Sequence, residues 1–192
     1  MGAKCMFVVA SSGDPSSRLR DLPAIDVAAS NSLATAILGT RTWGRKRRAY
    51  RTGNLAEDAN PHDETGIGVF GELVIVSGDE TASWIEQDVP AWGGALLEAG
   101  DVDAFVLHSV VTMGGFAFWR NSTPIRAFAG AEGEAIIDQG SRLPFERDLD
   151  VAEHGYEWIA ENALLDRLGF SYEGPPSTDG FDPATVPLLM YR

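Results

Sequence analysis

A histidine and a serine stand side by side between two apolar runs, in the segment DAFVLHSVVTMGGFAFW at residues 103–119. The pair raises the question of nucleophilic catalysis, in which a histidine takes the proton of a serine hydroxyl. Such a serine also needs an orienting third group and an oxyanion hole, normally on a turn of the type G-x-S-x-G, and no such turn is present. Adjacent residues of a regular strand point to opposite faces, so the side chains of His108 and Ser109 would not meet. We predict no catalytic residues and interpret His108 as a half-buried histidine that hydrogen-bonds across a sheet.

A second candidate for chemistry is a cluster of six basic residues within eleven positions: Arg41, Arg45, Lys46, Arg47, Arg48 and Arg51. One interpretation is a contact with a phosphate or another anion. The other is a solvated strand or loop whose charges pair with the protein's own acids. We take Arg45, Arg47 and Arg48, together with His108, as the candidate ligand-binding residues.

The sequence predicts no metal site and no cofactor. His62 lies in the acidic segment EDANPHDET, but the EF-hand spacing is absent, and His154 lies in AEHGYEW without an HExxH motif. The turn SSGDP at residues 11–15 carries neither GxGxxG nor a P-loop, so turn chemistry explains it. The single cysteine, Cys5, excludes a cysteine-based metal cage and an intrachain disulfide, which favours a reducing cytoplasm.

Net charge bears on the partners. The chain has 28 acidic and 15 basic side chains, a formal net charge of −13, and the basic cluster leaves the remainder strongly acidic. This field repels nucleic acid and attracts cationic surfaces, so we expect a basic protein as the partner. The acids expected to be exposed are Glu57, Asp58, Asp63, Glu64, Asp79 and Glu80.

The elements that position these residues follow from apolar patterning. Residues 4–11 predict a buried, central strand, and residues 67–76 predict a strand or bent hairpin. The predicted antiparallel meander has strands at 103–111, 116–119, 125–129 and 135–138. The predicted helices start near Asp21 and end at Gly39, span about 90–98, and end at Gly169.

The fold class that these elements predict is α+β, a mostly antiparallel sheet with a C-terminal β-meander and about three helices packed on it. The length of 192 residues and the 44% apolar content predict a single domain over residues 1–192. The first apolar run, residues 5–10, is far shorter than the roughly 20 residues that a membrane helix needs, so no membrane association is expected.

Four segments in a fixed order carry a resemblance: MGAK followed by an apolar strand and GDP, then LHSVVTMGGFAFW, then GEAIIDQGSRLPFE, and finally ALLDRLGFSYEG. In this order they resemble a family of uncharacterised actinobacterial proteins known only as a domain of unknown function. The family usually has a longer insert after LPFE, which this chain shortens to RDLDVAEHGYEW. The resemblance implies a shared fold and no activity.

Two functional hypotheses remain. The first is a non-enzymatic, acidic cytoplasmic interaction protein, immunity-like or regulatory, that docks on a basic partner. The second is a binder or enzyme that acts on a small anionic or phosphorylated ligand near His108 and the basic stretch 41–51. The oligomeric state is left open by the sequence.

Overall fold

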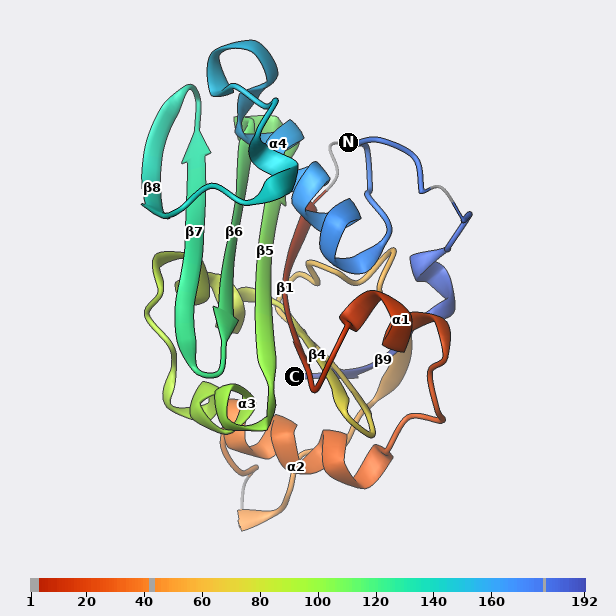
Figure 1. Ribbon diagram of the computed structural model, residues 1–192. Helices are drawn as coiled ribbons and strands as arrows, with labels where there is room; N and C mark the ends of the chain where they lie inside the picture. The colour runs from red at the N-terminus through yellow and green to blue at the C-terminus, as the bar shows by residue number, and fades with distance from the viewer. Residues whose placement is uncertain (1–3, 42–43, 178) are drawn as a thin grey trace.

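The computed structural model describes residues 4–41, 44–177 and 179–192, and its centre is one nine-stranded antiparallel sheet (Figure 1). The opening Met-Gly-Ala of the first family motif and positions 42–43 of the basic stretch lie outside the described residues. The strands are β1 Lys4–Ser11, β2 Arg51–Asn54, β3 Thr65–Phe70, β4 Leu73–Ser77, β5 Asp101–His108, β6 Met113–Arg120, β7 Thr123–Ala131, β8 Glu134–Gly140 and β9 Pro187–Tyr191. They are arranged in the order β2-β9-β3-β4-β1-β5-β6-β7-β8.

The first strand is central and buried, as its sequence predicts. β1 pairs with β4 on one side and with β5 on the other. Phe7 and Val8 point to opposite faces and are both fully buried, because helices or 3-10 turns cover each face. The side chain of Lys4 is not described.

The predicted meander is confirmed, since β5, β6, β7 and β8 pair with one another in chain order. The segment 67–76 forms the hairpin of β3 and β4. The chain end returns as β9, which enters the sheet between β2 and β3. The apolar patterning of the sequence does not by itself predict this last strand.

The expectation of about three helices was too low. Four α-helices are present among the described residues: α1 Pro15–Arg20, α2 Val27–Leu38, α3 Gly94–Ala99 and α4 Val151–Leu168. α1 was not predicted: it begins where the predicted turn 11–15 ends, and Asp14 caps it by accepting a hydrogen bond from the Ser17 backbone N–H at 2.8 Å. The class remains α+β.

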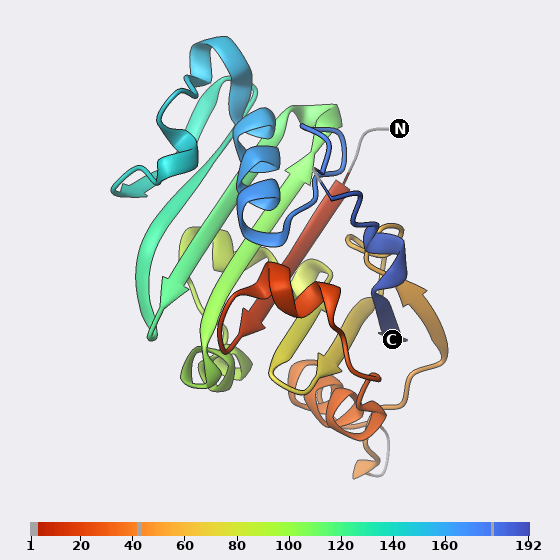
Figure 2. The same ribbon diagram turned by 45° about the vertical axis from the view of Figure 1, so that its right-hand side comes forward.

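Helices lie on both faces of the sheet. α1 and α4 cover one face (Figure 2), where Phe105, Phe116 and Phe118 pack against α4. The other face carries α2, α3 and the 3-10 segment η2 Asp79–Glu86, whose Trp84 is fully buried. No helix in the described part of the chain has the length and apolar character that a membrane span requires.

A shared carboxylate holds α4 against the sheet. Asp103 of β5 is buried and accepts hydrogen bonds from Arg120 of β6 at 2.7 Å and from Arg167 of α4 at 2.9 Å. Because both cations share this acid, the C-terminal half of α4 has a fixed position over β5 and β6. The first turn of α4 is separated from the rest of the helix by a kink at Gly155, where the backbone φ is 77°.

Candidate functional site

The predicted ligand-binding residues do not come together. His108 is the last residue of β5, and Arg45, Arg47 and Arg48 follow the C-terminal end of α2. Figure 1 shows the end of β5 and α2 at opposite ends of the molecule. A single ligand contacting both His108 and the basic stretch is therefore incompatible with this fold.

His108 and Ser109 do not form a catalytic pair. The strand ends at His108, three residues earlier than predicted, and Ser109 opens the 3-10 turn η4 Ser109–Val111. His108 Nδ1 and Ser109 Oγ are both buried without a hydrogen-bond partner among the described residues, so neither atom activates the other. The expected hydrogen bond across the sheet is not made at Nδ1.

The basic stretch divides into engaged and exposed residues. Arg47 donates hydrogen bonds to the carbonyls of Leu38 at 2.8 Å and Gly39 at 2.9 Å, which completes the C-terminus of α2. Its guanidinium also donates to the Arg192 carbonyl. Arg45 and Arg48 are exposed.

Arg51 belongs to an internal network that we call the arginine clamp: Tyr50, Arg51, Asp58, Glu64 and Arg192. Arg51 donates to Asp58 at 2.6 Å and to Glu64 at 2.7 Å, and Arg192 donates to Glu64 at 2.6 Å. The Tyr50 hydroxyl, with these two guanidinium groups, lowers the pKa of Glu64 to about 2.

Two of the acids expected to be exposed, Asp58 and Glu64, are instead part of the arginine clamp. The side chains of Asp58 and Glu64 are only 11% and 8% exposed, because both are turned inward to Arg51. Glu57, Asp63 and Asp79 are exposed as expected. The acidic surface that remains for a partner is therefore smaller near residues 57–64 than the sequence indicates.

A cavity of about 290 Å³ opens beside the kink of α4. It is lined by Thr112, His154, Gly155, Glu157, Trp158, Glu161 and Glu173. Neither an arginine nor a lysine is among these lining residues, whereas three of them are glutamates. The cavity is thus suited to a cationic group.

The carboxylates of the cavity differ in what holds them. Glu161 is 2% exposed and accepts the backbone N–H groups of Tyr172 at 2.8 Å and Glu173 at 2.9 Å, which fixes the loop after α4. Glu157 has a buried Oε1 without a hydrogen-bond partner in the described part of the chain. Burial and the nearby charge of Glu173 raise the pKa of Glu157, while His108 opposes this effect. Burial raises the pKa of Glu161 as well.

Exposed apolar side chains surround this cavity. Val110 is 70% exposed, Val111 36% and Trp158 38%. Trp158 lines the cavity together with Thr112, the residue after η4, and the carbonyl of Val111 accepts the Glu132 backbone N–H from the β7–β8 turn. We call this surface the acidic end: the cavity, the turn η4 and the β7–β8 turn at 131–134.

Most residues of the acidic end are not predicted as site residues by the sequence. Glu157 and Glu161 are four residues apart on α4 and therefore lie on one face of the helix, a signal present in the sequence. Thr112 and Glu173 come from distant segments, and their approach depends on the fold. Among the described residues no three His, Cys, Asp or Glu side chains are arranged to hold a metal ion.

Residues 5–191 match the model of a family described as "Family of unknown function (DUF6928)", and the chain belongs to that family. The search of curated proteins and the search of solved structures returned no match.

Proposed function

Since membership in this family supplies no activity, we propose from the geometry that the protein is a non-enzymatic acidic interaction protein of the cytoplasm that docks on a basic protein. The acidic end is the docking surface. The observation that carries the proposal is that the exposed Trp158 lines the same cavity as Glu157, whose buried Oε1 has no hydrogen-bond partner among the described residues.

An exposed aromatic side chain beside a carboxylate is a combination found in stable protein interfaces. An aromatic side chain at the centre supplies buried apolar area, and polar groups around it determine which partner fits. An arginine or lysine that enters the cavity would donate a hydrogen bond to the unpartnered oxygen of Glu157 and would favour the ionised form of this carboxyl. The partner therefore presents a basic residue beside an apolar one.

A protein fits better than a small molecule. The cavity volume of about 290 Å³ is at the lower limit of small-ligand pockets, which hold about 300–1,000 Å³. Val110 and Val111 point outward from the turn beside it and not into an enclosed space. Such a surface is covered by a partner and not filled by a ligand.

The first step of the test is to obtain the partner. Proteins captured from a lysate of the native host at low and at high salt are identified, and those lost at high salt are purified, because electrostatic docking weakens with ionic strength. We expect a partner with a basic surface. Capture that is insensitive to salt, or of an acidic protein, contradicts the proposal.

The second step compares three triple variants against that partner. Glu132→Gln, Glu153→Gln and Glu157→Gln together should slow association about tenfold and flatten its salt dependence. The matched control neutralises the exposed acids Glu86, Asp88 and Glu98, which lie elsewhere, and should bind as the wild type does. The third variant replaces Arg41, Arg45 and Arg48 by glutamine. If only this third variant loses binding, an anionic ligand at the basic stretch is the better explanation.

A further inference from the structure

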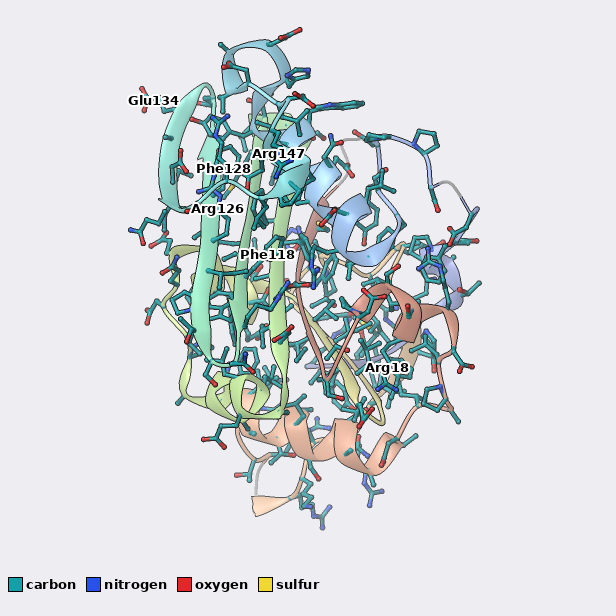
Figure 3. All side chains as sticks on the ribbon, in the orientation of Figure 1. Arg18, Phe118, Arg126, Phe128, Glu134 and Arg147 are labelled. Atoms are coloured by element: carbon teal, nitrogen blue, oxygen red, sulfur yellow. The ribbon has the colours of Figure 1, made fainter. Side chains whose placement is uncertain are left out.

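Glu157 has no cation within the described part of the protein to compensate its charge. Its Oε1 is buried without a hydrogen-bond partner, and no described arginine or lysine side chain forms an ion pair with it. The meander on which α4 packs contains a buried guanidinium, that of Arg126, which lies over the ring of Phe128 (Figure 3). This cation is already used, because Arg126 donates hydrogen bonds to Asp138 at 2.5 Å and to Glu146 at 2.6 Å.

Titratable groups face Glu157 from its own helix, from β5 and from the loop after α4. They are Glu161 and His154 on α4, His108 at the end of β5, and Glu173 on the loop. Burial, and after it the charge of Glu173, raises the pKa of Glu157, and His108 opposes this effect without cancelling it. Glu157 therefore takes up a proton at a higher pH than an ordinary glutamate does.

Protonation of these groups acts against a docked cation. A proton on Glu157 removes the negative charge that attracts the partner's arginine or lysine, and a proton on His108 or His154 adds a positive charge nearby. Glu161 differs, because its two oxygens keep their backbone N–H partners whether a cation is docked or not. Glu157 is therefore the carboxylate whose ionised form gains most from the docked cation.

We propose that the partner's cation and a proton compete for Glu157, so that mild acid releases the partner from the acidic end. The inference rests on the proposed function, since it assigns a regulation to the same docking surface. A docked cation stabilises the ionised carboxylate, so docking between neutral pH and the ordinary glutamate pKa releases a proton from Glu157. Ordinary exposed glutamates titrate at about pH 4.3 and keep their charge through most of this window.

The first measurement needs no partner. Isotope labelling of the glutamate carboxyl carbons reports the ionisation of Glu157 by NMR, and the spectrum of Glu157→Gln provides the assignment. The probe is n-butylammonium chloride, the analogue of a lysine side chain. At about 100 mM it should lower the titration midpoint of Glu157 by about half a pH unit relative to sodium chloride at the same concentration.

Two controls accompany this titration. The neutral 1-butanol, which has the same carbon chain as the probe, should leave the midpoint of Glu157 unchanged. The exposed Glu153 on the same helix should not respond to n-butylammonium. Equal midpoints of Glu157 in n-butylammonium chloride and in sodium chloride would overturn the inference.

The second measurement uses the captured partner at constant ionic strength. Its dissociation constant for the wild type should rise about tenfold from about pH 7.5 to about pH 5. Glu157→Gln should bind more weakly at the higher pH and change less than about threefold over the same range, because the competing proton has lost its site. The control Glu153→Gln should keep the full change.

The outcomes separate this inference from the proposed function. Docking that depends on salt but not on pH contradicts the inference and leaves the proposed function standing. A pH dependence that persists in Glu157→Gln and disappears in His108→Asn or His154→Asn assigns the response to an imidazole and also contradicts the inference. If no basic partner is captured, the proposed function fails, and the n-butylammonium titration alone decides whether Glu157 exchanges a proton for a cation.

Discussion

Glu64 and Glu157 lie in opposite halves of the sheet and have opposite electrostatic surroundings. Glu64, which precedes β3, accepts hydrogen bonds from Arg51 and Arg192, and its pKa is lowered to about 2. Glu157, on α4 above the meander, has an unpartnered oxygen and a raised pKa. The charge of Glu64 is thus compensated within the protein, whereas Glu157 keeps a carboxylate oxygen that a partner can use.

The largest expected effect comes from removing the centre of the arginine clamp. Arg51→Ala leaves the poorly exposed Asp58 without a guanidinium partner and leaves Glu64 with Arg192 as its remaining guanidinium partner. We expect a loss of about 2–4 kcal/mol in the free energy of unfolding, measured by urea denaturation. The exposed Arg48 is the control, and Arg48→Ala should change stability by less than about 0.5 kcal/mol. Equal losses in the two variants would show that the clamp is not structural.

The second prediction concerns the free energy of unfolding at low pH. Because the pKa of Glu64 is lowered to about 2, the folded state binds fewer protons at this site than the unfolded state between the ordinary glutamate pKa and about pH 2. Stability from Glu64 is therefore present near pH 7 and is lost as the pH falls through that window. Glu64→Gln should cost about 1–3 kcal/mol at pH 7 and give a shallower decline toward pH 2. Parallel urea titrations from pH 7 to pH 2.5 measure this, and identical slopes for both proteins would contradict it.

The sequence was sufficient to predict the buried strand β1 and the antiparallel meander β5–β8, which form one half of the sheet. Apolar runs and turn residues define β1 and the meander, because local alternation and turn chemistry determine these strands. β2 was not predicted, because it consists of the four residues RTGN and is a strand only through its pairing with β9. α1 was missed because a serine-rich, proline-containing segment serves equally as a turn and as a capped helix.

The candidate site was harder to predict than the fold. His108 and the arginines of the basic stretch were predicted as ligand-binding residues from their residue types, yet the fold separates them. The cavity depends on the loop after α4, which two backbone hydrogen bonds to Glu161 bring against the helix. Gly174 permits that approach, since a Cβ at this position would lie 2.5 Å from the Cβ of Glu161. Such long-range packing leaves no periodic signal in the sequence.

The smallest expected effect is that of Glu157→Gln. This substitution should stabilise the protein at neutral pH, whereas Glu64→Gln should destabilise it. Because burial and Glu173 raise the pKa of Glu157, the folded state binds more protons there than the unfolded state just above the ordinary glutamate pKa. The cost of ionising Glu157 is therefore incurred as the pH rises and is fully present at neutral pH. Glu157→Gln should remove it and raise the melting temperature at pH 7 by about 1–3 °C, with little change at pH 4.

Glu153→Gln on the same helix is the control, because Glu153 is exposed, and it should leave the melting temperature unchanged. A drop in the melting temperature of Glu157→Gln at pH 7 would mean that the ionised carboxylate is stabilised within the protein. A rise, together with slower association with the partner, would mean that this glutamate costs stability in the free protein and contributes in the complex. That outcome distinguishes a carboxylate used for docking from one used, like Glu64, to hold the fold.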